Sequence, residues 1–328
     1  MDKYTVSPYQ PGDEDAILAL HNRSFSGHAA RTDRHWTWKF LENPLGRTEI
    51  MLAKEKDGRC VGVYAGVTHP IILDNAPCLA GNHIDVAIDE KLRQGMAGAR
   101  LLLDLGRRYF ATYAGGDTKL TWGFPEPALH RLGLRLIKFE VLRDVVFLVR
   151  KPELPAGIPE EIEVQAVKKF GEEVDALWRQ CLSEIGTGTV RDTRYLNWRY
   201  AAHPEVAHVL LEARDRKNGT LRGVTVLREG GWDPLILSMV DWLAPLDDRA
   251  AETALIRYAL GETARRRKRY LVCWFPAPRI QFNRFQIDHA FFAQATPYQE
   301  CFRAFTKGLD RRWLDQHWYQ TMGDIDFF

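Results

Sequence analysis

The stretch RTDRHWTWKFLENP, residues 31–44, recurs later in the chain as RDTRYLNWRYAAHP, residues 191–204. Alignment without a gap pairs two arginines, a tryptophan and a proline of the first stretch with identical residues of the second. Apolar residues four apart, such as Trp36 and Phe40, predict a helix, and the proline at its end predicts where the helix stops. The recurrence indicates that one domain occurs twice.

The similarity extends outward from this stretch on both sides. Upstream, residues 4–20 resemble residues 162–178, and both predict a strand, a turn and an amphipathic helix that opens with acidic residues. Downstream, residues 49–67 resemble residues 207–227, and both predict a hairpin with a polar turn. Two later pairs match as well: HIDVAI (83–88) with MVDWLA (239–244), and FPEP (124–127) with FPAP (275–278).

Each half therefore predicts the order strand, helix, helix, hairpin, strand, helix, strand. This order predicts an α/β protein, an α+β mixed sheet in each of two tandem domains related by an internal repeat. We place the first domain at residues 1–150 and the second at residues 161–328. The segment KPELPAGIPE, residues 151–160, contains three prolines and is the predicted linker.

Composition limits the classes of function. The 328 residues suit about two domains, and Lys+Arg 45 against Asp+Glu 43 leaves a net charge of +2. This balance gives no reason to expect nucleic acid or a membrane surface as a partner, so a small molecule is expected. The polar N-terminus and single, scattered cysteines predict a cytoplasmic protein without metal. The oligomeric state stays open.

A glycine-containing loop in the first half carries the clearest chemical signal. Residues 93–98, RQGMAG, follow the predicted strand at 83–88 and precede apolar residues at helical spacing. Unpaired backbone N–H groups and the helix dipole make such a helix start a binding site for a diphosphate, and glycines let the backbone approach it.

This loop and the order of elements resemble the GNAT superfamily of acyl-CoA-dependent N-acyltransferases, whose loop has the form Arg-x-x-Gly-x-Gly. Met96 stands where the family has its first glycine, and Gly95 lies one position earlier. The resemblance implies acetyl-CoA, or another acyl-CoA, as the cofactor. It places the cofactor on the following residues: Val86, Ala87, Ile88, Arg93, Gln94, Gly95, Met96, Ala97 and Gly98.

The second half lacks this signal. Its matching segment, residues 240–260, has Asp247 and Asp248 and no glycine in the loop, where a phosphate would meet negative charge. We expect the second domain to bind no cofactor and to serve as a structural partner, a wall of the substrate cleft, or both.

Candidate catalytic residues lie on and after the strand that precedes the loop. Strand alternation puts His83, Asp85 and Ala87 on one face, so Asp85 or His83 could take the proton of an attacking amine. Asp241 at the matching place of the second half favours a structural role for Asp85. Glu126 replaces the asparagine that follows Phe-Pro in the family, and the tyrosine that protonates the leaving thiolate there has no counterpart.

The predicted function is acyl transfer from coenzyme A to a primary amine of a small molecule. The Trp-x-Trp-Lys helix and the Phe-Pro turn resemble members associated with bacterial polysaccharide synthesis, which makes an amino sugar a candidate acceptor. Two alternatives stay open. The chain could be a non-catalytic GNAT-like binding protein, or an aminoacyl-tRNA-dependent peptide-bridge transferase, although the latter would need a basic groove.

Overall fold

The structure is a computed structural model, and it describes residues 4–25, 30–93, 95–125, 130, 133–154, 157–231 and 233–325. The chain forms two compact units. Unit 1 comprises Met1–Pro70, Cys78–Arg143 and Tyr298–Leu309, and unit 2 comprises Ile71–Pro77, Asp144–Pro297 and Asp310–Phe328. No helix in the described ranges is long and apolar enough to cross a membrane.

The first part of the chain contains the elements of unit 1 in the predicted order. They are β1 (Tyr4–Pro8), α1 (Glu14–Ser24), α2 (Asp33–Phe40), β2 (Glu49–Glu55), β3 (Cys60–Leu73), β4 (Ala76–Ile88), α3 (Gly95–Tyr113), β5 (Thr118–Gly123) and the π-helical turn η1 (Gly133–Ile137).

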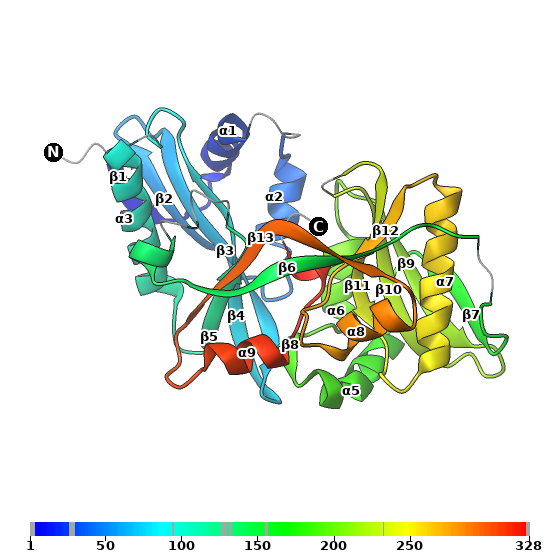
Figure 1. The fold of residues 1–328 in the computed structure, drawn as a ribbon. Coiled ribbons are helices and arrows are strands. Elements are labelled where there is room, and N and C mark those ends of the chain that lie inside the picture. The colour runs from blue at the N-terminus through cyan, green and yellow to red at the C-terminus, as the bar shows by residue number, and fades with distance from the viewer. Residues whose placement is uncertain are drawn as a thin grey trace. The chain divides into compact units, whose positions relative to one another are not determined.

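The sheet of unit 1 has the strand order β1-β2-β3-β4-β5-β13, where β13 is Phe292–Ala304. β1 with β2 and β2 with β3 are antiparallel, β4 and β5 are parallel, and β13 is antiparallel to β5. Helices α1 and α2 lie on one face of this sheet and α3 lies on the other (Figure 1).

The remaining elements belong to unit 2 wholly or in part. They are β6 (Glu140–Arg150), β7 (Ile162–Val167), α5 (Glu173–Ile185), β8 (Thr187–Thr189), α6 (Thr193–Leu196), the π-helical η2 (Asn197–Ala201), β9 (His208–Asp215), β10 (Leu221–Glu229), β11 (Ile236–Leu243), α7 (Arg249–Arg265), β12 (Tyr270–Cys273), α8 (Ile280–Ile287), α9 (Arg311–His317), β14 (Trp318–Tyr319) and the 3-10 turn η3 (Met322–Asp324).

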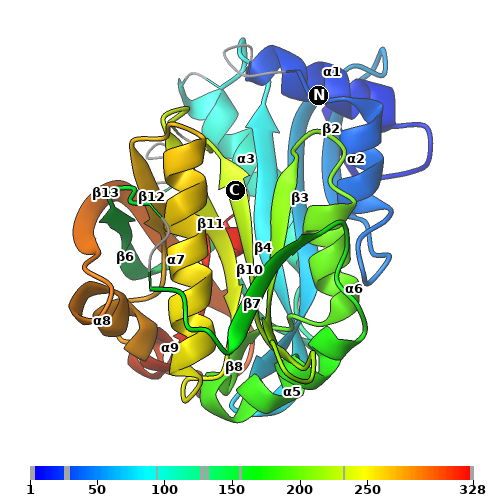
Figure 2. The same cartoon turned by 90° about the vertical axis from the view of Figure 1, so that its right-hand side faces the viewer.

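The sheet of unit 2 repeats the pattern of the first with the order β7-β9-β10-β11-β12-β6. Its β11 and β12 form the parallel pair, and β6 is antiparallel to β12. Helix α7 covers one face of this sheet, and α5 and α6 lie on the other (Figure 2). The two sheets and their flanking helices confirm the predicted α/β fold with a tandem repeat.

The units are not contiguous halves of the chain. Residues 298–304 at the end of β13 pair with β5 of unit 1, and residues 148–150 of β6 pair with β12 of unit 2. Each sheet thus takes its last strand from the other half of the sequence. The predicted halves 1–150 and 161–328 differ from the units at residues 71–77, 144–150 and 298–309.

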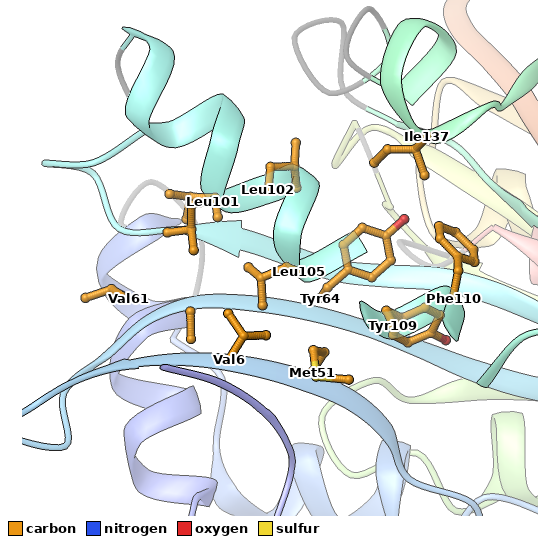
Figure 3. Packing of buried hydrophobic residues seen from close by; sticks show 12 residues of the cluster. Val6, Met51, Val61, Tyr64, Leu101, Leu102, Leu105, Tyr109, Phe110 and Ile137 are labelled. Atoms are coloured by element: carbon orange, nitrogen blue, oxygen red, sulfur yellow. The ribbon is translucent and has the colours of Figure 1, made fainter. Parts of the chain in front are cut away.

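The core of unit 1 forms where α3 packs on the sheet. Leu101, Leu105 and Tyr109 recur on one side of α3 and are buried against β1, β2 and β3 (Figure 3). Their spacing gives one apolar stripe along the helix. Removal of this apolar surface from water stabilises the unit by about 1.5 to 3 kcal/mol for each fully buried large side chain.

The repeated stretch begins in the same way in both units. The Thr32 hydroxyl accepts a hydrogen bond from the His35 N–H at 3.1 Å and caps α2. The Asp192 carboxylate accepts one from the Tyr195 N–H at 2.7 Å and caps α6. Both side chains satisfy a backbone donor at a helix start. In the first copy the helix α2 ends at Phe40. In the second copy the helix α6 is followed directly by η2, which ends at Ala201.

Candidate acyl-CoA site on unit 1

The loop before α3 is held by its own backbone. The carbonyl of Asp89 accepts hydrogen bonds from the N–H groups of Leu92 and Arg93, each at 2.9 Å, and the Asp89 N–H donates to the Val61 carbonyl at 2.9 Å. The buried Asp89 carboxylate pairs with Arg59 at 3.0 Å. Asp89 was not predictable from the sequence, because a lone aspartate after a strand has no distinctive spacing.

The backbone of the loop requires glycine at two positions, for a different reason at each. Gly95 has φ of +74°, a left-handed conformation that glycine adopts at little cost. A Cβ on Gly98 would lie 2.5 Å from the Leu92 carbonyl oxygen and 2.7 Å from the Cα of Arg93. Gly98 therefore lets the loop fold back onto the first turn of α3.

The other predicted loop residues differ in what they offer. Met96 is 75% exposed, so its side chain extends into solvent. The backbone N–H of Arg93 donates to the Asp89 carbonyl. The Arg93 guanidinium lies 3.4 Å from the Glu90 carboxylate and is half-exposed. Ala97 is exposed on the first turn of α3. Gln94 and Glu126 lie outside the described residues, so their predicted roles stay predictions.

The equivalent helix start in unit 2 has a different chemistry. The Asp248 carboxylate caps α7 by accepting from the Ala251 N–H at 2.9 Å. It also accepts two hydrogen bonds from the Arg222 guanidinium, at 2.5 and 2.7 Å. A carboxylate of the chain itself thus binds where the first copy offers backbone N–H groups. The two helix starts thus differ in the groups that they offer, and the predicted absence of a cofactor in unit 2 stays a prediction.

Strand β4 extends beyond its parallel neighbour. The register of β4 with β5 runs from Leu79 opposite Thr118 to Asn82 opposite Trp122, and β5 ends at Gly123. β4 continues to Ile88, so the backbone of Val86, Ala87 and Ile88 lies past the end of β5. The backbone groups of this segment that face the β5 side therefore have no partner on β5.

His83 and Asp85 do not share a face, which corrects the prediction from strand alternation. Asp85 has φ of +52°, a left-handed conformation that breaks the alternation at this residue. His83 contacts Tyr109 and Phe110 of α3, whereas Asp85 contacts His21 of α1 and Lys39 of α2. The two candidates therefore lie on opposite faces of the sheet.

His83 is enclosed by aromatic rings. Its ring stacks on Phe110 at 5.1 Å between centroids and meets the edges of Tyr64 and Phe139. Its Nδ1 lies 2.9 Å from the Tyr64 hydroxyl. Removal from water, with the nearby positive charge of Arg303, lowers the pKa of His83 to about 3. The imidazole is neutral near pH 7 and is a weak base.

Asp85 is a buried carboxylate between cations. Arg31 forms a close ion pair with it, Lys39 Nζ lies 3.3 Å from Oδ2, and His21 Nε2 lies 3.6 Å from Oδ1. Burial alone would raise the pKa of Asp85, but Arg31, Lys39 and His21 together lower it well below its usual range. A carboxylate held ionised in this way is a poor proton acceptor.

Unit 2 contains the same ion pair with additional partners. Arg191 Nε donates to Asp241 at 2.8 Å, as Arg31 pairs with Asp85 in the first copy. Arg191 also binds Asp324 at 2.6 Å, and Asp241 accepts from Tyr200 at 2.7 Å. The repeated arginine of the two stretches is thus explained by a repeated buried carboxylate. In unit 2, Asp324 of the C-terminal segment adds a second carboxylate to this arginine.

A pocket of about 10 Å³, which is about the space that one water molecule needs, lies beside Asp85 in unit 1. His21, Arg31 and Asp85 supply its polar lining, and side chains of α1, α2, β2 and β3 supply its apolar lining. The Ser24 hydroxyl, one helical turn after His21, lies 3.5 Å from the Ile88 carbonyl. His21 is therefore close to the part of β4 that extends past β5. His21 was not predictable as a site residue, because the sequence of α1 does not show that this histidine lies near Asp85.

The sequence matches no model of a protein family and no curated protein. The fold, however, is similar to several solved structures. A GCN5-related N-acetyltransferase from Anabaena variabilis has a TM-score of 0.65 at 11% identity, over 92% of this chain and 73% of that one. A tandem GNAT protein from the clavulanic acid biosynthesis pathway has a TM-score of 0.58 at 10% identity, over 92% and 98%.

A third similar structure is the N-myristoyltransferase of Saccharomyces cerevisiae with bound myristoyl-CoA. It has a TM-score of 0.61 at 10% identity, over 92% of this chain and 82% of that one. These similarities confirm the tandem GNAT fold that the sequence predicted. At such low identity they show the fold alone.

Proposed function

We propose that the protein is an acyl-CoA-dependent N-acyltransferase, with acetyl-CoA as the first donor to test and a primary amine of a small molecule as the acceptor. The difference between the two helix starts carries this proposal. In unit 1 the first turn of α3 offers backbone N–H groups behind two glycines. In unit 2 the Asp248 carboxylate accepts a hydrogen bond from the Ala251 N–H in the first turn of α7. An amino sugar is the acceptor class that we would screen first.

The residues of unit 1 suit a diphosphate. The N–H groups of residues 95–98 open α3, and the first four N–H groups of a helix have no partner within it. The helix dipole adds partial positive charge at the same place. Gly98 is the position where a side chain would push the loop away. We propose that these groups, with the half-exposed Arg93 guanidinium, bind the diphosphate of acyl-CoA.

The other steps of acyl transfer require groups of the protein itself. A thioester brings an acyl group that is already activated, so the protein has to hold the amine, accept its proton and stabilise an oxyanion. We propose that a backbone N–H among Val86, Ala87 and Ile88 is the oxyanion donor, because this part of β4 extends past β5.

We propose His21 as the general base and Asp85 as the residue that orients it. His21 lines the small pocket with Asp85 and lies one turn from Ser24, which contacts the Ile88 carbonyl. Its counterpart in the aligned second half is Arg179, whereas Asp85 recurs as Asp241. A catalytic role restricted to unit 1 fits a residue that unit 2 lacks.

Turnover of variants tests this assignment. His21→Gln is expected to lower turnover by about 10² or more and to leave acetyl-CoA affinity unchanged, because a general base acts on the amine. His83→Gln is the matched control and is expected to keep most of the turnover. A loss in His83→Gln alone would move the base to His83, and equal losses in both variants would refute a specific role for His21.

Titration calorimetry with acetyl-CoA tests the proposal as a whole. We expect one binding event per chain, which Gly98→Asp abolishes and Asp248→Ala leaves unchanged. A stoichiometry of two, or full binding by Gly98→Asp, would refute the placement of the cofactor.

One observation favours a second candidate function, a non-catalytic acyl-CoA-binding protein. Asp85 is held between cations, and His83 is a weak base inside an aromatic cluster. Binding of acetyl-CoA without turnover of any amine in a broad screen would support this candidate over the enzyme.

A further inference from the structure

A cavity of about 380 Å³ lies beside the C-terminal half of α3 in unit 1. Its apolar wall consists of Phe110, Ala111 and Ala114 of α3 with Ile137 of η1. Figure 3 shows Phe110 and Ile137 near one another at this end of the core. Three cationic side chains complete the lining: Arg107, Lys138 and Arg303. Sites for small molecules have this size and this mixture of apolar walls and few polar groups.

The lining carries three positive charges and no carboxylate. Among the residues that the structure describes, the side chains of Arg107 and Lys138 have no hydrogen-bond or ion-pair partner. Arg108, the next residue of α3, differs in this respect because its Nε donates to Asp104 at 3.1 Å. Three like charges around one cavity repel each other, and an anion bound between them would relieve that repulsion.

Arg303 has side-chain contacts that hold it in place. Its guanidinium lies 4.2 Å above the ring centroid of Phe110 and 5.5 Å from that of Phe305. Its Nη1 donates to the Ile137 carbonyl at 2.9 Å. These contacts fix the plane of a half-buried guanidinium without a carboxylate partner in the described part of the chain. A preorganised guanidinium binds planar anions through paired N–H groups.

Lys138 is positioned by an uncommon backbone conformation. Its φ is +60°, which places a residue with a Cβ in the left-handed region directly after η1. Such a conformation is unfavourable for a non-glycine residue and persists where the surroundings determine it. The strain is a second sign that the geometry of this cavity is specified.

We propose that this cavity binds a small amphipathic anion, an organic carboxylate, sulfonate or phosphate ester with an apolar body. The cations would bind the anionic group, and Phe110, Ala111, Ala114 and Ile137 would contact the apolar body. This site is separate from the proposed diphosphate site. Arg107 lies 12 residues after Gly95 on α3, which corresponds to about 18 Å along the helix.

The probe for this site is 8-anilinonaphthalene-1-sulfonate, whose fluorescence rises in an apolar site. N-phenyl-1-naphthylamine has the same ring system without the sulfonate. We expect saturable binding of the sulfonate to the full chain, weaker binding at higher salt, and much weaker binding of the neutral amine. Equal affinity for both probes, or no saturable binding of the sulfonate, would overturn the proposal.

Variants locate the binding in the cavity. Arg107→Gln and Lys138→Gln are each expected to weaken sulfonate binding roughly 2- to 5-fold, as the loss of one exposed charge contact does. Arg108→Gln on the same helix is the matched control and should bind like the natural chain. Ala111→Trp keeps every charge but fills the cavity, so it should abolish binding. Wild-type affinity in Arg107→Gln, Lys138→Gln and Ala111→Trp would overturn the proposal.

Competition separates this site from the proposed acyl-CoA site. Saturating acetyl-CoA is expected to leave sulfonate binding intact, and Gly98→Asp should leave it intact as well. Competitive displacement of the sulfonate by acetyl-CoA would overturn the separation and assign the cavity to the cofactor. Failure of acetyl-CoA to bind at all would refute the proposed function and leave this second site standing.

Discussion

At the scale of single residues, one buried carboxylate has different surroundings in the two units. Asp241 is paired with Arg191 and further bonded by Tyr200, and Asp324 binds the same arginine. Asp85 has Arg31 and Lys39, and Phe40 stands where the second copy has the Tyr200 hydroxyl. The same ion pair is thus buried among further hydrogen-bond partners in unit 2, whereas in unit 1 it lies beside a small pocket.

His83 predicts a pH dependence of stability. Its pKa of about 3 lies below the ordinary value near 6.5, so between these values the unfolded chain binds a proton that the folded chain does not. Stability should therefore fall as the pH drops from about 6.5 toward 3, by about 1.4 kcal/mol per pH unit for this residue.

The variant His83→Phe should remove this contribution, although it also loses the hydrogen bond to Tyr64. The measurement is the free energy of unfolding at pH 7, 6 and 5. His208, whose pKa burial also lowers to about 3, should account for part of the slope that is left. An unchanged slope in His83→Phe would mean that the histidine is protonated in the folded protein.

Gly98 predicts a second effect at this scale. Gly98→Ala should destabilise the loop by about 1 to 3 kcal/mol, because its Cβ would overlap the backbone of Leu92 and Arg93. Acetyl-CoA affinity should fall with it. Met96→Gly removes an exposed side chain and should bind acetyl-CoA equally or more tightly. Calorimetry of both variants checks this, and equal affinity of Gly98→Ala and the natural chain would contradict it.

At the scale of elements, the sequence predicted the type of most strands and helices but not the break in β4. Alternation placed His83 and Asp85 together because nothing in HIDVAI marks a residue with positive φ. The backbone conformation of Asp85 directs its carboxylate toward two cations, Arg31 before α2 and Lys39 of α2. Periodicity within one strand cannot report contacts with other elements. The glycine loop was predictable because the need for glycine depends on the backbone of the loop itself.

Asp248 predicts the behaviour of the second helix start. Asp248→Ala removes the N-cap of α7 and the ion pair with Arg222, which should cost about 1 to 2 kcal/mol of stability. Acetyl-CoA affinity should not change. Thermal unfolding with and without acetyl-CoA measures both quantities. A gain of a second acetyl-CoA site in this variant would show that the carboxylate alone excludes the cofactor from unit 2.

At the scale of the whole molecule, each unit depends on a strand from the distant half of the sequence. The order of elements predicted the tandem repeat, since each sheet has the same order of five strands. The exchange of the sixth strand was not predictable. The alternation of residues within a strand does not determine which strand pairs with it. Fragments that follow the predicted boundaries would therefore lack a strand.

The fragment of residues 1–150 is expected not to fold as a stable unit. Without residues 298–309, the edge of β5 loses its antiparallel partner, and Trp122 loses its neighbour Phe302. Arg143, buried in the intact chain, loses Glu300 at 3.0 Å. The fragment thus loses a hydrogen-bonded strand and an ion pair together, which is a large part of the marginal stability of a domain.

Joining residues 298–309 to residue 143 through a flexible glycine-serine linker should restore cooperative unfolding, because it returns the missing strand to the same sheet. The control carries Glu300→Gln in the joined strand and should fold with lower stability. Amide hydrogen exchange of β5 measures the outcome, since protection of Lys119–Trp122 requires a paired edge. Equal protection in the bare fragment 1–150 would show that unit 1 does not need the exchanged strand.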